Sequence, residues 1–234
     1  MDAHARTVMI TGAAGNLGRC VARSFLAEGA HLVLVDLHRA SLEHAFGAED
    51  ERRLLAPTNL LEPEQVNGAV TAAIERYGRI DVLCNLAGGF RMGEAVHETA
   101  DPNWDFLFDI NARTLLHAVR AVVPHMIERG GGKIVNVGAF SAQEGLARMG
   151  AYCAAKGAVI RLTEAMAAEL REKNVNVNCV LPTIIDTPEN RAAMPDADPS
   201  RWVAPEDLAN VIAFLASDAA RAIHGAALPV TGLS

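Results

Sequence analysis

The chain has 234 residues and a formal net charge of −7, and half of its residues are hydrophobic. This composition is typical of a globular protein and excludes the disordered and fibrous classes. A mildly acidic chain without a Lys/Arg run does not indicate nucleic-acid binding, and no apolar run reaches the ~20 residues that cross a membrane. With no apolar leader and no metal-ligand spacing among its four cysteines, we expect a cytoplasmic protein without a metal site.

Short apolar runs alternate with amphipathic helical patterns along the chain. The runs are rich in Val, Ile and Leu, which is typical of strands covered on both faces of a parallel sheet. We predict strands at residues 7–11, 31–35, 52–56, 80–86, 133–137, 175–181 and 226–230. We predict helices at residues 17–28, 39–47, 63–77, 103–129, 151–173 and 205–217. This order predicts an α/β fold, with one doubly wound parallel sheet of about seven strands and helices on both faces.

Two of the predicted connections are long, at residues 87–102 and 182–204. Both follow strands and therefore leave the carboxyl edge of the sheet, where ligands bind in this architecture. Long polar loops that contain proline are more often functional there than simple spacers. We expect residues 182–204 to act as a substrate loop.

The segment "TGAAGNLG" (11–18) follows the first predicted strand and opens the first predicted helix. Its glycines, Gly12, Gly15 and Gly18, permit a tight turn, close approach of the backbone to a phosphate and close helix–strand packing. The helix N-terminus adds free N–H groups for a pyrophosphate. This segment predicts a dinucleotide-binding loop.

Asp36 ends the second predicted strand, eighteen residues after the glycine loop. A carboxylate at this position accepts hydrogen bonds from the adenosine ribose and repels a 2′-phosphate. It therefore favours NAD(H) as the cofactor. NADP(H) is not excluded, because His38 and Arg39 follow and an arginine accommodates that phosphate.

Tyr152 and Lys156 are four residues apart, so they share one face of the predicted helix. A tyrosine titrates near pH ~10, which is too high for efficient base catalysis at neutrality. A cation one helical turn away favours the phenolate and lowers the pKa of the phenol. The pair is a candidate for proton transfer.

With the glycine loop, Asp36, "NLAG" (85–88), Asn111 and the Tyr152–Lys156 pair in this order, the chain resembles the short-chain dehydrogenase/reductase family over nearly its whole length. The resemblance implies one Rossmann-type dinucleotide-binding domain over residues 1–234. It also implies hydride transfer between a nicotinamide and a small organic substrate. A homodimer or homotetramer is implied, built largely through the long helices that begin near residues 103 and 151.

The resemblance also implies the roles of individual residues. Tyr152 is the general acid/base, Lys156 binds the nicotinamide ribose and lowers the pKa of Tyr152, and Asn111 holds a proton-relay water. Cofactor contacts are implied for Gly12, Gly15, Asn16, Leu17, Gly18, Asp36, Leu37, Asn59, Leu60, Asn85, Ala87, Gly88, Tyr152, Lys156, Pro182, Ile184 and Thr187.

The sequence departs from the family pattern at two positions. Asn16 stands where family members of this length usually have a glycine, and Ala139 stands where the catalytic serine is usual. An alanine donates no hydrogen bond to a developing oxyanion, and one such donor is worth on the order of 3 kcal/mol of barrier. Ser141 would face the same side as Ala139 in an extended stretch, so it is either a displaced catalytic donor or a plain loop serine.

The segment "LPTIIDTPENRAAMPDADPSRW" (181–202) resembles dihydropteridine reductases, a branch that also lacks the serine. Its substrate, a quinonoid dihydropterin, places no full negative charge on a carbonyl oxygen. Quinonoid dihydropteridine reduction is therefore one alternative, beside carbonyl or 3-oxoacyl reduction and an NAD(H)-binding sensor with little turnover. Candidate pocket residues in the two long loops and nearby are Phe90, Arg91, Met92, Met149, Asn190, Met194 and Trp202.

Overall fold

Apolar residues, many of them β-branched, form the strands of one parallel sheet. The computed structural model describes residues 5–234. Within these residues the strands are β1 (Thr7–Thr11), β2 (His31–Asp36), β3 (Arg53–Pro57), β4 (Val82–Asn85), β5 (Gly132–Val137), β6 (Val175–Pro182) and β7 (Ala227–Val230). They form one seven-stranded sheet in the order β3-β2-β1-β4-β5-β6-β7, and every pair of neighbours is parallel. The predicted doubly wound sheet is confirmed, and the strand bounds agree within two residues.

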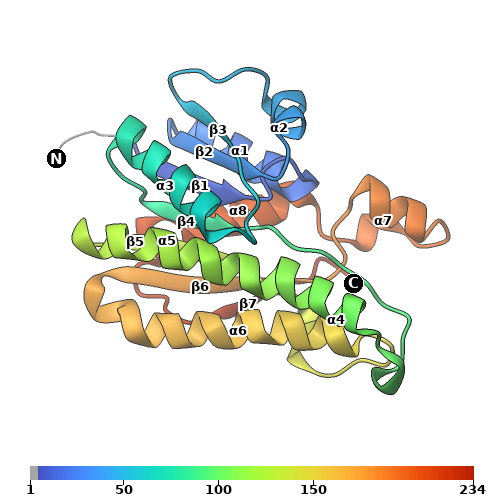
Figure 1. The fold of residues 1–234 in the computed structure, drawn as a ribbon. Helices are drawn as coiled ribbons and strands as arrows, with labels where there is room; N and C mark the ends of the chain where they lie inside the picture. Colours follow the sequence, from blue (N-terminus) through green and yellow to red (C-terminus); the bar gives the residue numbers. More distant parts are fainter. Residues whose placement is uncertain (1–4) are drawn as a thin grey trace.

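Helices connect the strands and cover both faces of the sheet (Figure 1). They are α1 (Asn16–Ala27), α2 (Arg39–Phe46), α3 (Pro63–Tyr77), α4 (Asp101–Phe108), α5 (Thr114–Glu128), α6 (Gly150–Leu170), α7 (Pro188–Ala193) and α8 (Pro205–Leu215). A π-helical segment, η2 (Asp109–Arg113), joins α4 to α5. Single 3₁₀ turns are η1 (Val96–Glu98), η3 (Phe140–Gln143), η4 (Arg171–Lys173), η5 (Pro199–Arg201) and η6 (Asp218–Ala220).

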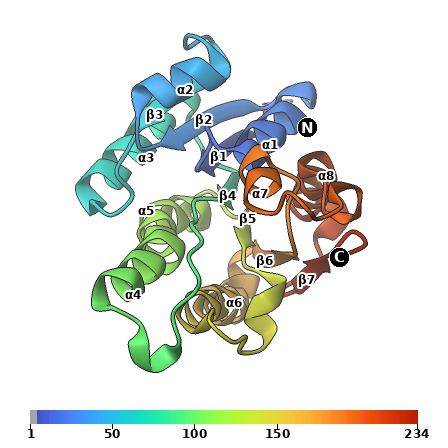
Figure 2. The same ribbon diagram turned by 90° about the vertical axis from the view of Figure 1, so that its right-hand side faces the viewer.

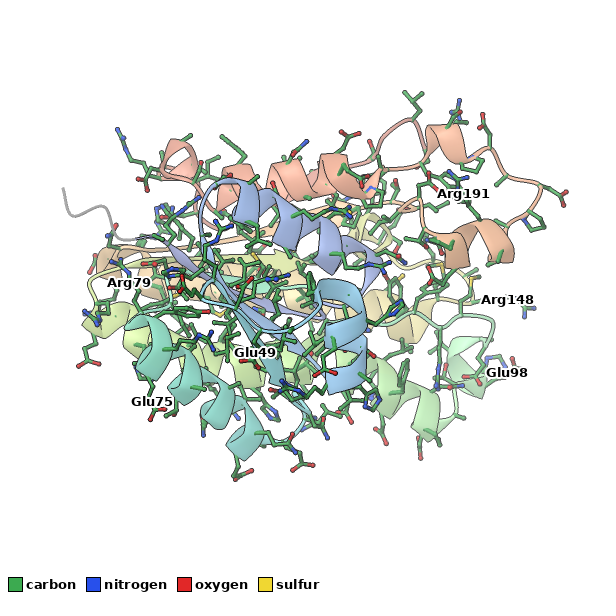
Figure 3. The ribbon with its side chains drawn as sticks, turned by 90° about the horizontal axis from the view of Figure 1, so that it is seen from above. Glu49, Glu75, Arg79, Glu98, Arg148 and Arg191 are labelled. Atoms are coloured by element: carbon green, nitrogen blue, oxygen red, sulfur yellow. The ribbon has the colours of Figure 1, made fainter. Side chains whose placement is uncertain are left out.

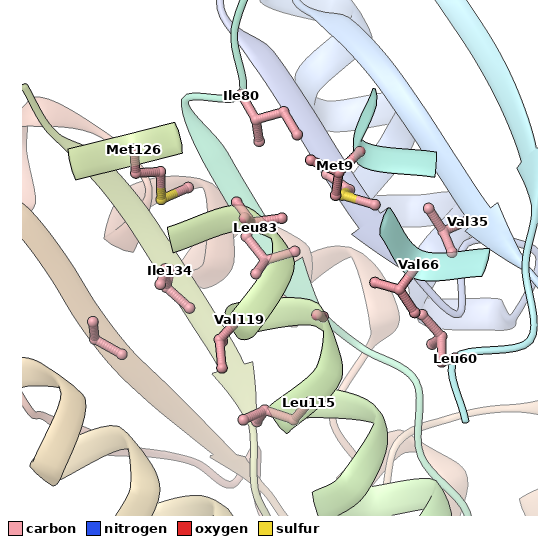
Figure 4. Packing of buried hydrophobic residues seen from close by; sticks show 14 of the residues in the cluster. Met9, Val35, Leu60, Val66, Ile80, Leu83, Leu115, Val119, Met126 and Ile134 are labelled. Carbon is pink, nitrogen blue, oxygen red and sulfur yellow. The ribbon is translucent and has the colours of Figure 1, made fainter. Parts of the chain in front are cut away.

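Two hydrophobic clusters lie on opposite faces of the sheet. One cluster joins the strands to α3, α5 and α6, and the other joins them to α1 and α8. Seen end-on, the sheet separates α3 and α5 from α1 and α8 (Figure 2). Figure 4 shows how Met9, Leu83 and Ile134 of three strands meet side chains of the covering helices. Burial on both faces explains why the strands are apolar at nearly every position.

The prediction of one continuous α-helix over residues 103–129 is wrong. It is interrupted at η2, where the side chain of Asn111 donates to the Leu107 carbonyl oxygen at 2.9 Å. A side chain that takes a carbonyl of the preceding turn competes with the regular helical hydrogen bond, and π-bulges arise at such points. At this interruption the side-chain amide of Asn111 also contacts the backbone of Gly89, which follows β4.

The connection at 182–204, predicted as a loop, contains a short helix. Pro188 opens α7, and the side chain of Thr187 accepts a hydrogen bond from the Asn190 backbone N–H at 3.2 Å. Proline at the first helical position after a capping threonine is a strong local start signal. This signal was present in "DTPENR" (186–191), so the helix was predictable.

Leu83 lies at the centre of the sheet and is fully buried. We expect Leu83→Ala to lower the free energy of unfolding by about 3 kcal/mol, because truncation loses buried apolar surface and leaves a cavity. Leu233→Ala is the matched control, since Leu233 is 68% exposed, and its cost should stay below ~0.5 kcal/mol. Urea denaturation of both variants measures the difference; equal costs would contradict this packing.

Candidate active site

A cavity of about 480 Å³ lies where the strand order reverses, between β1 and β4. Ligands bind at this position in doubly wound sheets. Its walls come from the loops after β1, β2, β3 and β4, from η2 and α5, and from the segment before α7. The lining residues are Gly12, Gly15, Asn16, Leu17, Gly18, Asp36, Leu37, Thr58, Asn59, Leu60, Leu61, Leu86, Ala87, Gly88, Ile110, Thr114 and Thr187.

Two glycines of the loop have no room for a side chain. Gly12 has φ +65°, and a Cβ there would lie 2.9 Å from the Ala87 Cα. A Cβ at Gly18 would lie 2.4 Å from the Gly12 carbonyl oxygen. The loop therefore folds tightly against both the end of β4 and the start of α1. Gly15, by contrast, is the N-cap of α1 and is exposed at the cavity.

The carboxylate of Asp36 is held on the wall of the same cavity. One oxygen accepts from the Ala14 N–H at 3.0 Å, and the other accepts from the Leu37 N–H at 2.8 Å. The side chain of Asp36 thus links the end of β2 to the glycine loop. Each carboxylate oxygen has a further lone pair for a hydroxyl donor.

Lys156, Asn111 and Gly88 meet beside the cavity. Lys156 is 5% exposed, and its Nζ donates to the Val137 carbonyl oxygen at 2.8 Å. The Asn111 side chain accepts from the Gly89 N–H at 3.1 Å and donates to the Gly89 carbonyl oxygen at 2.9 Å. A Cβ at Gly88 would lie 2.9 Å from Asn111 Oδ1 and 3.1 Å from Lys156 Nζ. Only a glycine at position 88 leaves both polar groups within reach of the cavity.

Burial moves the pKa values of Tyr152 and Lys156 in opposite directions. It raises the pKa of the Tyr152 phenol to about 12 and lowers the pKa of the Lys156 ammonium to about 8. The direction for Tyr152 is the reverse of the sequence expectation, because desolvation disfavours the phenolate more than any neighbouring charge favours it. Burial therefore shifts both groups toward their neutral forms, although an ammonium with a pKa of about 8 is still mostly protonated at pH 7.

Tyr152 lines a second cavity, of about 190 Å³. Phe90 packs edge-on against the Tyr152 ring with 4.8 Å between the ring centroids. The cavity is lined by Arg91, Met92, Glu94, Thr99, Asn103, Leu107, Arg148, Met149, Gly150, Ala151 and Tyr152. Figure 3 shows Arg148, from the loop before α6, and Arg191, of α7, at the same end of the molecule, opposite Arg79.

The segment around the missing serine does not have the geometry assumed from the sequence. Ala139 is extended, with φ −154° and ψ 145°, but Phe140–Gln143 form the 3₁₀ turn η3. A 3₁₀ turn rotates successive side chains by about 120°, so the alternation that would align Ser141 with Ala139 is lost. Ser141 lines neither cavity, and its carbonyl oxygen accepts from the Cys153 thiol at 3.2 Å.

The other predicted site residues fall into two groups. Most of the predicted cofactor residues line the larger cavity, but Asn85, Tyr152, Lys156, Pro182 and Ile184 do not. Asn85 donates to Asn136 Oδ1 at 2.9 Å, and Asn136 donates to the Thr163 hydroxyl at 2.8 Å, so these side chains tie β4 and β5 to α6. Cavity residues that the sequence reasoning missed are Thr58, Leu61, Leu86, Ile110 and Thr114.

Neighbouring motifs could have revealed these missed residues. Thr58 and Leu61 flank the predicted pair Asn59–Leu60, and Leu86 lies inside "NLAG". Trp202, a candidate pocket residue, is 7% exposed and packed in the interior instead. Asn190 is also occupied locally, since its side chain donates to the Ile185 carbonyl oxygen at 2.8 Å.

The larger cavity fits a dinucleotide. Its glycine loop leaves the N-terminus of α1 open, and the Asp36 carboxylate, held against the same loop, has free acceptor positions for ribose hydroxyls. Among residues 5–234 no cluster of three His, Cys, Asp or Glu side chains is arranged to hold a metal ion. In the same range none of the helices combines the length and apolarity required to span a bilayer.

Known proteins resemble this chain over nearly its whole length. The family model for short chain dehydrogenase matches residues 6–198. The (2S)-[(R)-hydroxy(phenyl)methyl]succinyl-CoA dehydrogenase subunit BbsD of Thauera aromatica is 33% identical over 97% of this chain and 95% of its own. The 3-oxoacyl-[acyl-carrier-protein] reductase FabG of Thermotoga maritima is 31% identical over 99% of this chain and 98% of its own.

A solved structure agrees with these sequence relatives. Carveol dehydrogenase from Mycobacterium avium in complex with NAD superposes with a TM-score of 0.90 and 29% identity, covering 98% of this chain and 97% of that one. The family match, the order of the strands and the glycine-lined cavity all indicate the same family. The chain therefore belongs to the short-chain dehydrogenase family and is an oxidoreductase with a nicotinamide cofactor.

Proposed function

We propose that the protein is an NAD(H)-dependent oxidoreductase that transfers hydride between the nicotinamide and a small organic substrate. The observation that carries this proposal is the placement of Asp36 on the wall of a glycine-lined cavity beside which Lys156 is buried. When bound, the nicotinamide supplies or accepts the hydride. The rest of the chemistry belongs to the side chains of this chain.

The cofactor preference follows from charge. The Asp36 carboxylate accepts hydroxyl hydrogen bonds but repels a 2′-phosphate at close range, which favours NAD(H) over NADP(H). We assign diphosphate binding to the backbone of Gly15, Asn16 and Leu17 at the N-terminus of α1. We place the adenine beside Asn59 and Leu60. Thr187, which directly precedes α7, also lines the cavity and contacts the cofactor in this proposal.

Tyr152 acts as the general acid/base in this proposal. Its high pKa suits proton donation during reduction, because the phenol remains protonated at neutral pH. Lys156 orients the cofactor ribose and, when protonated, stabilises the phenolate that forms. Asn111, held by Gly89 and Leu107, fixes the widened η2 turn that would hold a relay water.

The substrate lies against Tyr152 in this proposal, with residues 182–204 as its loop within one dinucleotide-binding domain of residues 1–234. We also propose a homodimer or homotetramer through α4, α5 and α6, as the family resemblance implies. In this proposal the substrate occupies the smaller cavity beside Tyr152. Ala139 is 5% exposed and offers no donor to a carbonyl oxygen.

Ala139 favours substrates that do not need a strong oxyanion donor. A quinonoid dihydropterin is one such substrate, and the likeness of residues 181–202 to dihydropteridine reductases supports it. Carbonyl or 3-oxoacyl reduction is the second candidate, supported by the FabG relative. An NADH-oxidation screen with ketones, 3-oxoacyl thioesters, imines and a freshly generated quinonoid dihydropterin tests them. NADH binding without turnover of any substrate would instead favour a sensor.

Tyr152→Phe tests the proton-transfer role. We expect turnover to fall by at least ~100-fold, because the phenyl ring cannot exchange a proton, while NADH binding stays within about twofold. Phe90→Leu is the control, since it changes the ring packed against Tyr152 but leaves the hydroxyl. Activity of Tyr152→Phe near the wild-type value would refute the tyrosine mechanism.

Asp36→Asn tests the cofactor preference. The amide keeps an acceptor for the Ala14 N–H but removes the negative charge, so NADPH should bind about tenfold more tightly while NADH binding weakens. Fluorescence titration of both cofactors measures the ratio. The exposed Asp207→Asn, on α8, should leave the ratio unchanged; an equal shift there would assign the effect to net charge.

The buried ammonium of Lys156 predicts a pH dependence of stability. Burial lowers its pKa in the folded state from 10.5 to about 8, so between these values the unfolded state binds the proton more tightly. The Lys156 contribution to the free energy of unfolding therefore rises with pH through this window. Relative to Lys156→Met, the wild type should gain on the order of 2 kcal/mol between pH 7 and 9.5, measured by urea denaturation. A constant difference would contradict the lowered pKa.

A further inference from the structure

One hydrogen bond joins the glycine loop to the short helix α7. Asn16 Nδ2 donates to Glu189 Oε2 at 2.8 Å, although the two residues are 173 positions apart in the sequence. The other amide atom, Asn16 Oδ1, accepts from the Arg19 guanidinium at 2.6 Å. Figure 2 shows α7 beside α1 at the edge of the sheet. Asn16 is also the residue at which the glycine loop departs from the usual family pattern.

The contact lies at the place assigned to the cofactor diphosphate. Asn16 is the first residue of α1 and lines the larger cavity, and so does Thr187, two residues before Glu189. The N-terminus of a helix carries a partial positive charge, and the Arg19 guanidinium adds to it. The pKa of the Glu189 carboxyl is lowered by its own backbone N–H, the Thr187 hydroxyl, Asn16 and Arg19. Glu189 is therefore an anion at the point where a second anion binds.

Among the described residues 5–234, this contact is the only side-chain hydrogen bond that links residues 186–194 to another part of the fold. Every other side-chain hydrogen bond made by the described residues 186–194 stays within residues 185–194: Asn190 to Ile185 and Thr187, and Arg191 to Asp186. The Asp186 N–H donates to the Val203 carbonyl oxygen at the base of the segment. Apart from this backbone bond at the base of the segment, one side-chain hydrogen bond, from Asn16, links α7 to α1.

We propose that Glu189 is an internal competitor of the cofactor diphosphate, and that cofactor binding displaces its carboxylate from Asn16. The proposal rests on the proposed dinucleotide binding at the larger cavity. Two anions at one helix N-terminus repel each other, so the carboxylate lowers cofactor affinity in proportion to its charge. Glu189 is a positioning residue here: it takes no part in hydride transfer but sets the position of α7 and the affinity for the diphosphate.

Glu189→Gln separates charge from contact, because a glutamine oxygen still accepts from Asn16. Fluorescence titration at low salt should give NADH binding about fivefold tighter than in the wild type, and the gain should shrink at high salt because screening weakens repulsion. ADP-ribose, which carries the same diphosphate, should gain equally in competition against NADH. Adenosine, which lacks phosphate, should bind as it does to the wild type.

Asp196→Asn is the matched control, because Asp196 is an exposed carboxylate of the same long segment without a side-chain partner among the described residues. It should leave NADH affinity within about 1.5-fold of wild type. An equal gain in this control, or an equal gain for adenosine, would overturn the proposal in favour of general loop charge or adenine contacts. Unchanged or weaker NADH binding by Glu189→Gln would also overturn it. If neither wild type nor variants bind NADH, the proposed function itself fails.

Discussion

The close approach of the glycine loop to the end of β4 is the constraint on which the site depends. Gly12 turns with φ +65° within a distance of Ala87 that no side chain would tolerate, and Gly18 packs α1 onto the same turn. This contact sits where the strand order reverses, so the chain leaving β1 and the chain leaving β4 diverge to opposite faces. The cavity lies in the space between these two diverging chains. Its shape depends on glycine at positions 12 and 18, because a Cβ atom at either position would clash with neighbouring backbone.

Burial sets the pKa values of Tyr152 and Lys156. Lys156 forms no salt bridge within the described residues, and its ammonium group donates one hydrogen bond, to the Val137 carbonyl oxygen. Desolvation then brings its pKa to about 8 and raises that of Tyr152 to about 12. The spacing of four residues ensures that the two side chains share a helix face, but spacing carries no information about solvent. Titration behaviour is therefore a property of the fold.

Local and non-local features differ in how far the sequence predicts them. Strand bounds, the sheet type and most cavity residues follow from apolar runs and the glycine loop. The expected alignment of Ser141 with Ala139 is wrong, because it requires an extended stretch and η3 begins at the residue after Ala139. The break in the helix at Asn111 depends on a hydrogen bond to Leu107 that no periodicity records. The contact between Asn16 and Glu189 depends on how segments 173 positions apart fold together.

The departures at Ala139 and Asn16 act on different steps of the proposed reaction. At position 139 the substrate oxygen loses a donor, which raises the barrier only for reactions that build full negative charge on that oxygen. At position 16 an amide gives Glu189 a partner beside the proposed diphosphate site, and in our proposal this contact affects the binding of cofactor whatever the substrate. In the proposed reaction, substrate choice and cofactor affinity are therefore adjusted at different residues, while Tyr152 and Lys156 keep the arrangement that proton transfer requires.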